Sequence, residues 1–344
     1  MSKNDFQTDL KKHFLETIQT WRFWEKDESL ALCVSGGVDS IVMLHAILDL
    51  PKNIRPKPVV FHFDHALRGK QSAGEALFVK KICAKWSVPF YADKAKLKDW
   101  KYKNNLHERA RTMRYEFFFK QAVQLGIKKI LTAHQANDQA ETFLMHWIQG
   151  AGLKGLSGIP FVREHVWKEG LESGQKFSLV RPLLLSSRQS IEAYAKTHRL
   201  KYCKDPSNRD SKYLRTRLRR LILEIQKENP QFIERAAKNS LTLQEDERWL
   251  NEATEAAFYE GVERLGENWG CSHVFFQGLP RALQTRLIQK IVYEICEESL
   301  SFDRIVSMIR FLETSEKERV QKTFMLPGVR LKKEKTFFVF IKSE

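Results

Sequence analysis

The chain has 344 residues, of which 42% are hydrophobic and five are cysteines, and its formal net charge is +16. We expect a soluble, cytoplasmic protein, because no apolar run could span a membrane, the N-terminus lacks the core of a signal peptide, and the widely spaced cysteines argue against disulfides and against zinc or iron–sulfur sites. The positive charge points to a polyanionic partner, most simply nucleic acid, although a basic protein without such a partner has the same composition.

The first strong pattern is a strand that passes through two glycines into a helix. Leu30 to Val34 is a continuous apolar run, typical of a buried parallel strand, and an apolar helical pattern starts at Ile41. Glycines allow close approach of the backbone, and the free N–H groups and dipole of a helix start favour phosphate. We predict a phosphate site formed by Ser35, Gly36, Gly37, Val38, Asp39 and Ser40.

Asp39 stands out in this segment because a carboxylate does not bind phosphate directly. It is better suited to hold Mg²⁺, which would bridge the phosphates. The alternative is an ordinary glycine-rich turn, in which Asp39 is a favourable acid in the first turn of the helix.

Strand and helix patterns then alternate as far as residue 149. Strands are expected over residues 30–34, 59–63, 88–91 and 129–133, and helices over 6–21, 41–48, 73–86, 105–125 and 138–149. This order predicts an α/β fold with a doubly wound parallel sheet, which binds its ligands at the carboxyl ends of the strands.

The pattern changes after residue 160. Residues 161–167 and 177–180 indicate a hairpin appended to the sheet, residues 188–198 a short helix, and 213–226 a helix rich in arginine. Asn229-Pro230 marks a boundary, followed by helical patterns over 232–265, 280–296 and 302–312 and a pair of β runs around Pro327-Gly328. We predict an α/β domain over 1–212, a basic helical linker over 213–229, and a smaller, mainly helical domain with a small β ending over 230–344.

Polar residues follow the second predicted strand. Asp64, His65 and Arg68 would face the same crevice as the phosphate segment. They could contact a nucleotide, or Asp64 and His65 could form a capped turn, and their spacing favours neither interpretation.

The long helix over residues 105–125 begins with a basic face. Arg111 and Arg114 lie on this face with His107, and a guanidinium can bind two phosphate oxygens at once. From composition alone, a solvated basic face is the commoner explanation.

Acidic residues and a histidine follow the fourth predicted strand. Asn137 is expected to cap the next helix, which places Asp138 and Glu141 three residues apart on one face, with His134 nearby. The acids could complement the helix dipole, or they could recognise a cationic substrate or position its amine. The spacing does not decide between these roles.

A dense arginine cluster follows residue 208. Such density between two domains fits contacts to the RNA backbone, and a solvated helix face is the alternative. The expected RNA contacts are Arg209, Arg215, Arg217, Arg219 and Arg220.

Taken together and in order, these motifs resemble the tRNA(Ile)-lysidine synthetases, a family of the PP-loop group of ATP pyrophosphatases. The resemblance is strong between residues 30 and 220 and only general beyond. It rests on the segments 35–40, 64–68, 107–115, 132–142, 150–160, 181–184 and 205–208 with the arginines that follow.

The resemblance implies a two-step reaction in a PP-loop domain with a tRNA-binding C-terminal domain. ATP with Mg²⁺ would adenylate the wobble cytidine of an isoleucine tRNA with a CAU anticodon, releasing pyrophosphate. The side-chain amine of free L-lysine would then displace AMP, forming lysidine and changing codon reading from AUG to AUA. A homodimer is one possible assembly.

The resemblance also implies roles for individual residues. The phosphate segment and His65 would bind ATP, Arg111 and Arg114 would stabilise charge at the α-phosphate, and His134 would belong to the catalytic group. Asp138 and Glu141 would hold the lysine amine and help to remove its proton.

Three positions depart from the family pattern: Gln135 replaces a histidine, Asn137 an aspartate and Thr216 an asparagine. The chain is also short for the family.

Another PP-loop tRNA-modifying enzyme, such as a thiolase, would commonly carry paired cysteines, which are absent here. A non-catalytic RNA-binding protein with the same fold would not consume ATP when tRNA is added.

Overall fold

The computed structural model describes residues 10–66, 70–96, 106–167, 174–203, 214–297, 300–313, 323–326 and 328–342. The predicted RNA contact Arg209 lies outside these ranges, as do Arg68 and residues 205–208. The chain divides into two compact units, Met1–Gln244 and Glu245–Glu344, and the division falls inside one continuous helix, α9 (Phe232–Gly261). The second domain was predicted to start at residue 230, after a linker over 213–229, whereas the second compact unit starts at Glu245. The predicted domain limits stay a prediction.

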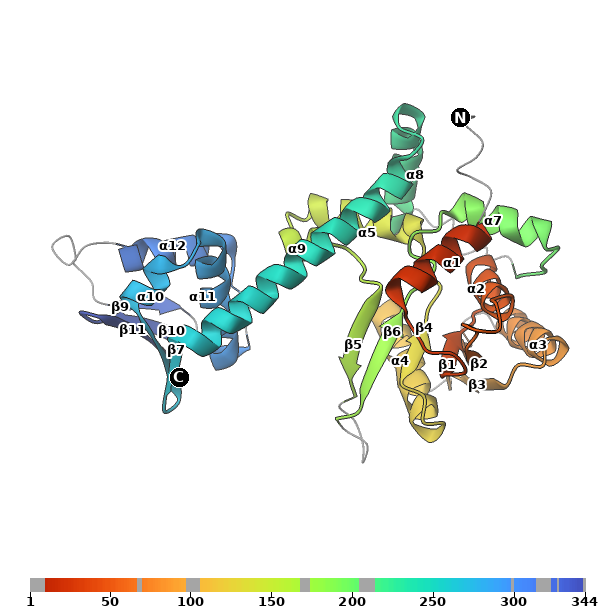
Figure 1. The fold of residues 1–344 in the computed structure, drawn as a ribbon, viewed down its shortest axis with the longest axis horizontal. Helices are drawn as coiled ribbons and strands as arrows, with labels where there is room; N and C mark the ends of the chain where they lie inside the picture. The colour runs from red at the N-terminus through yellow and green to blue at the C-terminus, as the bar shows by residue number, and fades with distance from the viewer. Residues whose placement is uncertain are drawn as a thin grey trace. The chain divides into compact units, whose positions relative to one another are not determined.

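A six-stranded sheet forms the centre of the first unit (Figure 1). Its order is β3-β2-β1-β4-β6-β5, and neighbouring strands are parallel except for the pair β6 and β5. The predicted parallel sheet with an appended hairpin is therefore confirmed. The strands are β1 (Ser29–Cys33), β2 (Lys57–Asp64), β3 (Phe90–Lys94), β4 (Lys129–Leu131), β5 (Val162–Val166) and β6 (Lys176–Val180).

Helices cover both faces of this sheet. Alternate residues of a strand point to opposite faces, so neighbouring residues of β1 belong to different cores. Leu30 and Leu32 of β1 belong to a core shared with helices α1, α2, α3 and α7, whereas Ala31 belongs to a core shared with α4. These helices are α1 (Leu10–Trp21), α2 (Val38–Leu48), α3 (Lys70–Lys85), α4 (Leu106–Gln124) and α7 (Arg188–Thr197).

The strand order creates a crevice at one edge of the sheet. From β1 the chain builds outward through β2 and β3, and then returns to add β4 on the other side of β1. Ligands of doubly wound sheets bind at such a switch point, beyond the carboxyl ends of the strands. The segment 35–40 follows β1 and His134 follows β4, so the fold brings the two predicted sites together.

A second layer of helices lies beside this crevice. Leu144 of α5 (Ala136–Ile148), Leu218 and Ile222 of α8 (Leu214–Glu228) and Ile233 of α9 share one apolar cluster. The arginine-rich helix is therefore anchored by an apolar face. A short helix, α6 (Leu153–Leu156), follows α5.

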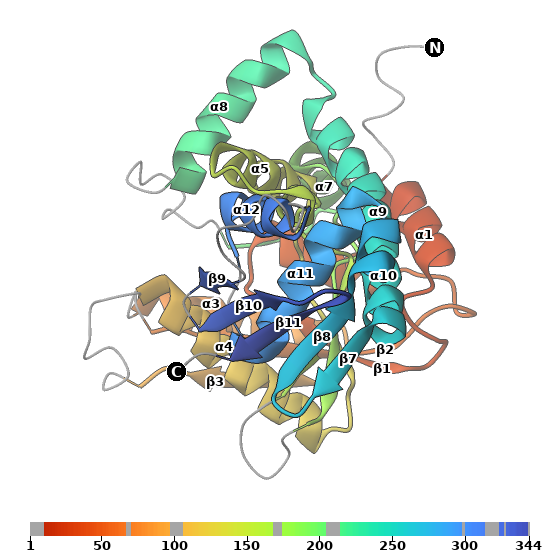
Figure 2. The ribbon, with the colours of Figure 1, turned by 90° about the vertical axis from the view of Figure 1, so that its left-hand side faces the viewer.

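The second unit contains a five-stranded antiparallel sheet of order β7-β8-β11-β10-β9 (Figure 2). Ile291 of α11, Met308 of α12 and Phe338 of β11 contribute to its apolar core. The remaining elements are β7 (Val262–Leu265), β8 (Asn268–Ser272), α10 (His273–Gly278), α11 (Arg281–Cys296), α12 (Phe302–Glu313), β9 (Thr323–Leu326), β10 (Val329–Lys333) and β11 (Phe337–Lys342).

One helix prediction was wrong at its C-terminal end. The pattern over 232–265 predicts helix throughout, but α9 ends at Gly261 and residues 262–265 form strand β7. Gly266, with φ of +68°, turns the chain into β8, and that strand pairs with β11 from the far end of the chain. The predicted small β ending is therefore part of a larger sheet. Among the helices of the described ranges, none has the length and apolarity to cross a bilayer.

Candidate functional site

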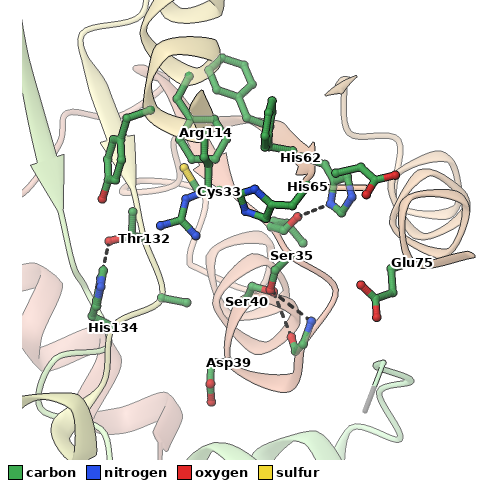
Figure 3. Close-up of a pocket in the computed structure, with 18 of the residues that line it drawn as sticks. Cys33, Ser35, Asp39, Ser40, His62, His65, Glu75, Arg114, Thr132 and His134 are labelled. Carbon is green, nitrogen blue, oxygen red and sulfur yellow. Dashed lines mark hydrogen bonds between the residues drawn. The ribbon is translucent and has the colours of Figure 1, made fainter. Parts of the chain in front are cut away.

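A cavity of about 660 Å³ lies at the carboxyl ends of β1, β2 and β4. In Figure 3, Thr132 and His134 lie on one side of it and His65 and Glu75 on the other, with Ser35 and Ser40 between them. The predicted site residues that line it are Ser35, Gly37, Asp39, Ser40, His65, Arg114, His134, Asp138 and Arg215.

The turn between β1 and α2 is held by hydrogen bonds within the turn and by one from Cys203. Gly36 has φ of +96°, which favours glycine, and its carbonyl accepts from the Cys203 N–H at 2.9 Å. The Ser40 hydroxyl donates to the Gly37 carbonyl at 3.0 Å, and the Ser35 and Ser40 hydroxyls lie 3.3 Å apart. No side chain caps α2 at Gly37, which leaves first-turn N–H groups available to an anion.

Asp39 lies in the first turn of α2 with a partner on each carboxylate oxygen. Gln135 Nε2 donates to Oδ1 and Arg188 NH1 donates to Oδ2, both at 3.3 Å. Burial raises the pKa of Asp39 to about 6, and the nearby charge of Asp138 acts in the same direction, while Arg188 opposes them.

The end of β2 carries a turn capped by Asp64. Its Oδ1 accepts from the Ala66 N–H at 2.7 Å, as the capped-turn interpretation requires. His62, which the sequence analysis did not select, donates through Nδ1–H to the Val34 carbonyl at 2.8 Å and so ties β2 to the start of the phosphate segment. His65 lines the cavity.

The two arginines of α4 flank one aromatic ring. The guanidinium carbons of Arg111 and Arg114 lie 5.2 and 5.6 Å from the centre of the Tyr115 ring. Arg114 and Tyr115 line the cavity. The basic face at the start of this helix is thus directed in part to the site.

His134 is held beside the cavity by a hydrogen bond of 2.8 Å between its Nδ1 and the Thr132 hydroxyl. Burial, together with the charges of the surrounding arginines led by Arg181, lowers the pKa of His134 to about 3. The imidazole is therefore neutral at physiological pH and can accept or donate a hydrogen bond.

Helix α5 starts two residues earlier than the sequence indicates. Asn137 was predicted as its N-cap, but the cap residue is Gln135, whose N–H donates to Asp138 Oδ2 at 3.0 Å. Asn137 Oδ1 instead accepts from the N–H of Arg188 at 2.9 Å. The prediction failed because the partner of Asn137 comes from the start of α7, which the local sequence cannot reveal.

Glu141 is buried, with a side chain that is 4% exposed. Its Oε1 accepts from Arg219 Nε at 2.7 Å, and its Oε2 has no hydrogen-bond partner among the described residues. Burial raises the pKa of Glu141 and the contact with Arg219 opposes this shift. Burial likewise raises the pKa of Asp138. Both acids therefore favour a ligand that brings positive charge or hydrogen-bond donors.

The predicted RNA contacts on α8 separate into different environments. All four arginines of α8 are exposed, but Arg215 also lines the cavity and Arg219 pairs with Glu141. Their role in RNA binding stays a prediction.

The glycine-rich segment after α5, residues 150–160, is tied to the surrounding elements by side-chain hydrogen bonds. The Gln139 side chain bonds both the N–H and the carbonyl of Ile159, at 2.7 and 3.0 Å, and Gln244 Nε2 donates to the same carbonyl at 3.0 Å. Buried Arg181 donates to the Pro160 carbonyl at 2.6 Å, and burial lowers its pKa to about 10.

Gln135 and Arg188 are the contacts of Asp39 that sequence reasoning missed. Gln135 was noted only as a departure from a family pattern. One indication for Arg188 was present in the sequence. A cation in the first turn of a helix opposes the helix dipole, so Arg188 could be expected to have an acidic partner.

The residues present fit Mg²⁺ as a shared ligand with phosphates. Mg²⁺ is usually held by one or two carboxylates together with substrate phosphates and water. Asp39 and Asp138 supply two carboxylates, and Ser35 and Ser40 supply hydroxyls, at the same cavity. Within the described ranges no group of three or more histidine, cysteine or acidic side chains could hold a metal without such help.

Several curated proteins with similar sequences are tRNA(Ile)-lysidine synthases. The tRNA(Ile)-lysidine synthase of Clostridioides difficile is 29% identical over 91% of this chain and 66% of its own length. The enzymes of the same name from Enterococcus faecalis and Geobacillus kaustophilus are 32% and 33% identical over 72% and 76% of this chain, but only 51% and 55% of their own lengths. The chain thus spans about half to two thirds of these curated relatives.

The fold has solved counterparts as well. The U34-tRNA thiolase NcsA from Methanococcus maripaludis superposes with a TM-score of 0.56 over 68% of this chain and 78% of that chain, at 16% identity, which supports the fold alone. A protein-family model described as a PP-loop domain matches residues 3–226, which include the phosphate segment, α5 and most of α8. The chain therefore belongs to the PP-loop domain family.

Proposed function

We propose that the protein is a tRNA(Ile)-lysidine synthase that joins L-lysine to C2 of the wobble cytidine at the expense of ATP. The observation that carries this proposal is that the glycine turn after β1 and the Asp138 carboxylate of α5 line one cavity at the switch point of the sheet. The names of the similar proteins, and the share of this chain that they match, support it.

In the first step, O2 of the cytidine attacks the α-phosphate of ATP and pyrophosphate leaves. The N–H groups at the start of α2 and the Ser35 and Ser40 hydroxyls bind the pyrophosphate oxygens, and Arg114 stabilises the charge that develops at the α-phosphate. Mg²⁺ bound by Asp39, with Asp138 close to it, would neutralise charge on the triphosphate.

In the second step, the ε-amine of lysine attacks C2 and AMP leaves with the former O2. A protonated amine is not a nucleophile, so a group must hold the ammonium and accept its proton. Asp138 and Glu141 suit this role because burial raises the pKa of each and Glu141 Oε2 has no donor in the part of the chain that the structure describes. Neutral His134 is suited to orienting the base by a hydrogen bond.

The direct test is incubation with ATP, lysine and an isoleucine tRNA transcript carrying a CAU anticodon, followed by nucleoside mass spectrometry. We expect lysidine at the wobble position and stoichiometric release of AMP and pyrophosphate. The Asp39→Ala variant should release no tRNA-dependent pyrophosphate. A transcript that returns unmodified cytidine, or a sulfur-containing nucleoside, would refute the proposal.

A further inference from the structure

Arg188 starts helix α7 at the rim of the site, in a position that the helix dipole disfavours for a cation. Two carboxylates compensate for this. Its Nε donates to Glu192 Oε1 at 2.7 Å, one turn along the same helix, and its NH1 donates to Asp39 Oδ2 at 3.3 Å. The guanidinium therefore bridges α7 and the phosphate segment.

The backbone beneath Arg188 is fixed to α5. Its N–H donates to Asn137 Oδ1 at 2.9 Å, and two residues earlier the Ser186 carbonyl accepts from the Ala136 N–H at 2.9 Å. Ser187 caps α7 by accepting from the Ser190 N–H. The starts of α5 and α7 are thus joined, so the approach of Arg188 to Asp39 is built into the fold.

The two contacts of Asp39 are of unequal kinds. Gln135 is buried, whereas the Arg188 side chain is 44% exposed and would keep Glu192 as a partner after leaving Asp39. A cation that binds Asp39 would share its carboxylate with the Arg188 guanidinium, which contacts Oδ2, and two cations on one carboxylate repel each other. Release of Arg188 into solvent removes this conflict at small cost.

We propose that Arg188 is the resident counter-ion of Asp39, which a divalent cation displaces when the nucleotide binds, so that this ion pair sets the metal concentration at which the site fills. The proposal rests on the proposed function, since it assumes that Asp39 meets Mg²⁺ in a nucleotide complex. Arg188 is then a positioning residue that holds Asp39 in place before the metal binds.

The test measures binding rather than turnover. Mg²⁺ is titrated into the full chain in the presence of α,β-methylene-ATP, and binding is followed by calorimetry. Arg188→Gln should lower the apparent dissociation constant for Mg²⁺ by about threefold, as expected for loss of a half-exposed competing ion pair. Glu192→Gln should raise it by about twofold, because Arg188 then has Asp39 as its only carboxylate partner among those in the structure.

Lys196→Gln is the matched control, since it removes one exposed positive charge from the last turn of the same helix. It should leave the Mg²⁺ titration unchanged. An apparent dissociation constant for Mg²⁺ that is unchanged or higher in Arg188→Gln would overturn the role of Arg188. A higher value would mark Arg188 as a nucleotide ligand instead. Failure of the unmodified protein to bind the analogue at any Mg²⁺ concentration would instead overturn the proposed function as well.

Discussion

At the residue scale, burial controls the charges around the cavity. It raises the pKa of the acids Asp39, Asp138 and Glu141 and lowers that of the base His134. In each case the neutral form gains, because a charge loses water that the protein only partly replaces. Two of these acids are paired with arginines from later in the chain, Asp39 with Arg188 and Glu141 with Arg219.

Asp39 should make stability depend on pH. Its pKa is 3.8 in an unfolded chain and about 6 in the fold, so the folded state binds more protons between these values and the free energy of unfolding falls as pH rises through them. Asp39→Asn removes this loss. From pH 4 to pH 7.5 its stability relative to the unsubstituted protein should therefore rise by about 2 kcal/mol, since the pKa shift already includes the contact with Arg188.

Urea unfolding at the two pH values measures this difference, and Asp303→Asn, at an exposed acid in α12, serves as the control. Equal effects of Asp39→Asn at both pH values would show that the carboxyl titrates normally in the fold.

Glu141 should affect the second step more than the first. Glu141→Gln keeps the shape of the side chain but removes the charge that attracts an ammonium group. We expect pyrophosphate release to remain measurable and the lysine concentration for half-maximal lysidine formation to rise by about tenfold. Glu224→Gln, at an exposed acid on α8, is the control. An unchanged lysine titration in Glu141→Gln would exclude Glu141 from lysine binding.

At the scale of elements, the sequence predicts what local pattern determines. The apolar run of β1, the glycine turn and the amphipathic α8 are properties of neighbouring residues, and each lies where the pattern places it. The contacts of Asp39 with Arg188 and of Glu141 with Arg219 join residues 149 and 78 positions apart. Periodicity contains no information about such pairs, so the site could be predicted as a set of residues but not as a network.

The end of α9 shows the same limit. Residues 262–265 continue a helical pattern, and they become a strand because β8 and the distant β11 offer a sheet to join. Tertiary pairing overrides local propensity there.

The clamped segment after α5 gives a stability prediction. Gly158 has φ of +71°, and a Cβ there would lie 2.7 Å from Gln139 Oε1. Gly158→Ala should lower the free energy of unfolding by about 2 kcal/mol, because both the backbone and the Gln139 contact are strained. Gly152→Ala is the control, since its φ is negative and its Cβ would meet nothing within 4 Å. Equal melting temperatures for the two variants would contradict the clamp.

At the scale of the whole molecule, the charge of +16 should appear as salt-dependent binding of tRNA. Arg217→Glu reverses an exposed charge on α8 without touching Glu141, unlike a change at Arg219. It should weaken tRNA binding and flatten the slope of log K against log salt by about one to two. Filter binding across a salt series measures this. Lys120→Glu, at an exposed site on α4, should have a smaller effect, and equal slopes in Arg217→Glu and the unsubstituted protein would remove Arg217 from the interface.

The unbroken course of α9 has a practical consequence for dissecting the protein. A fragment cut after Asn229, where the chain looks like a natural joint, would lose Ile233 and Ala237, which cover α5 and α8, together with Gln244, which fastens residue 159. The first unit therefore includes the opening turns of α9, a helix that continues into the second unit. A truncation that keeps these contacts has to end beyond residue 244, in the middle of a helix rather than in a loop.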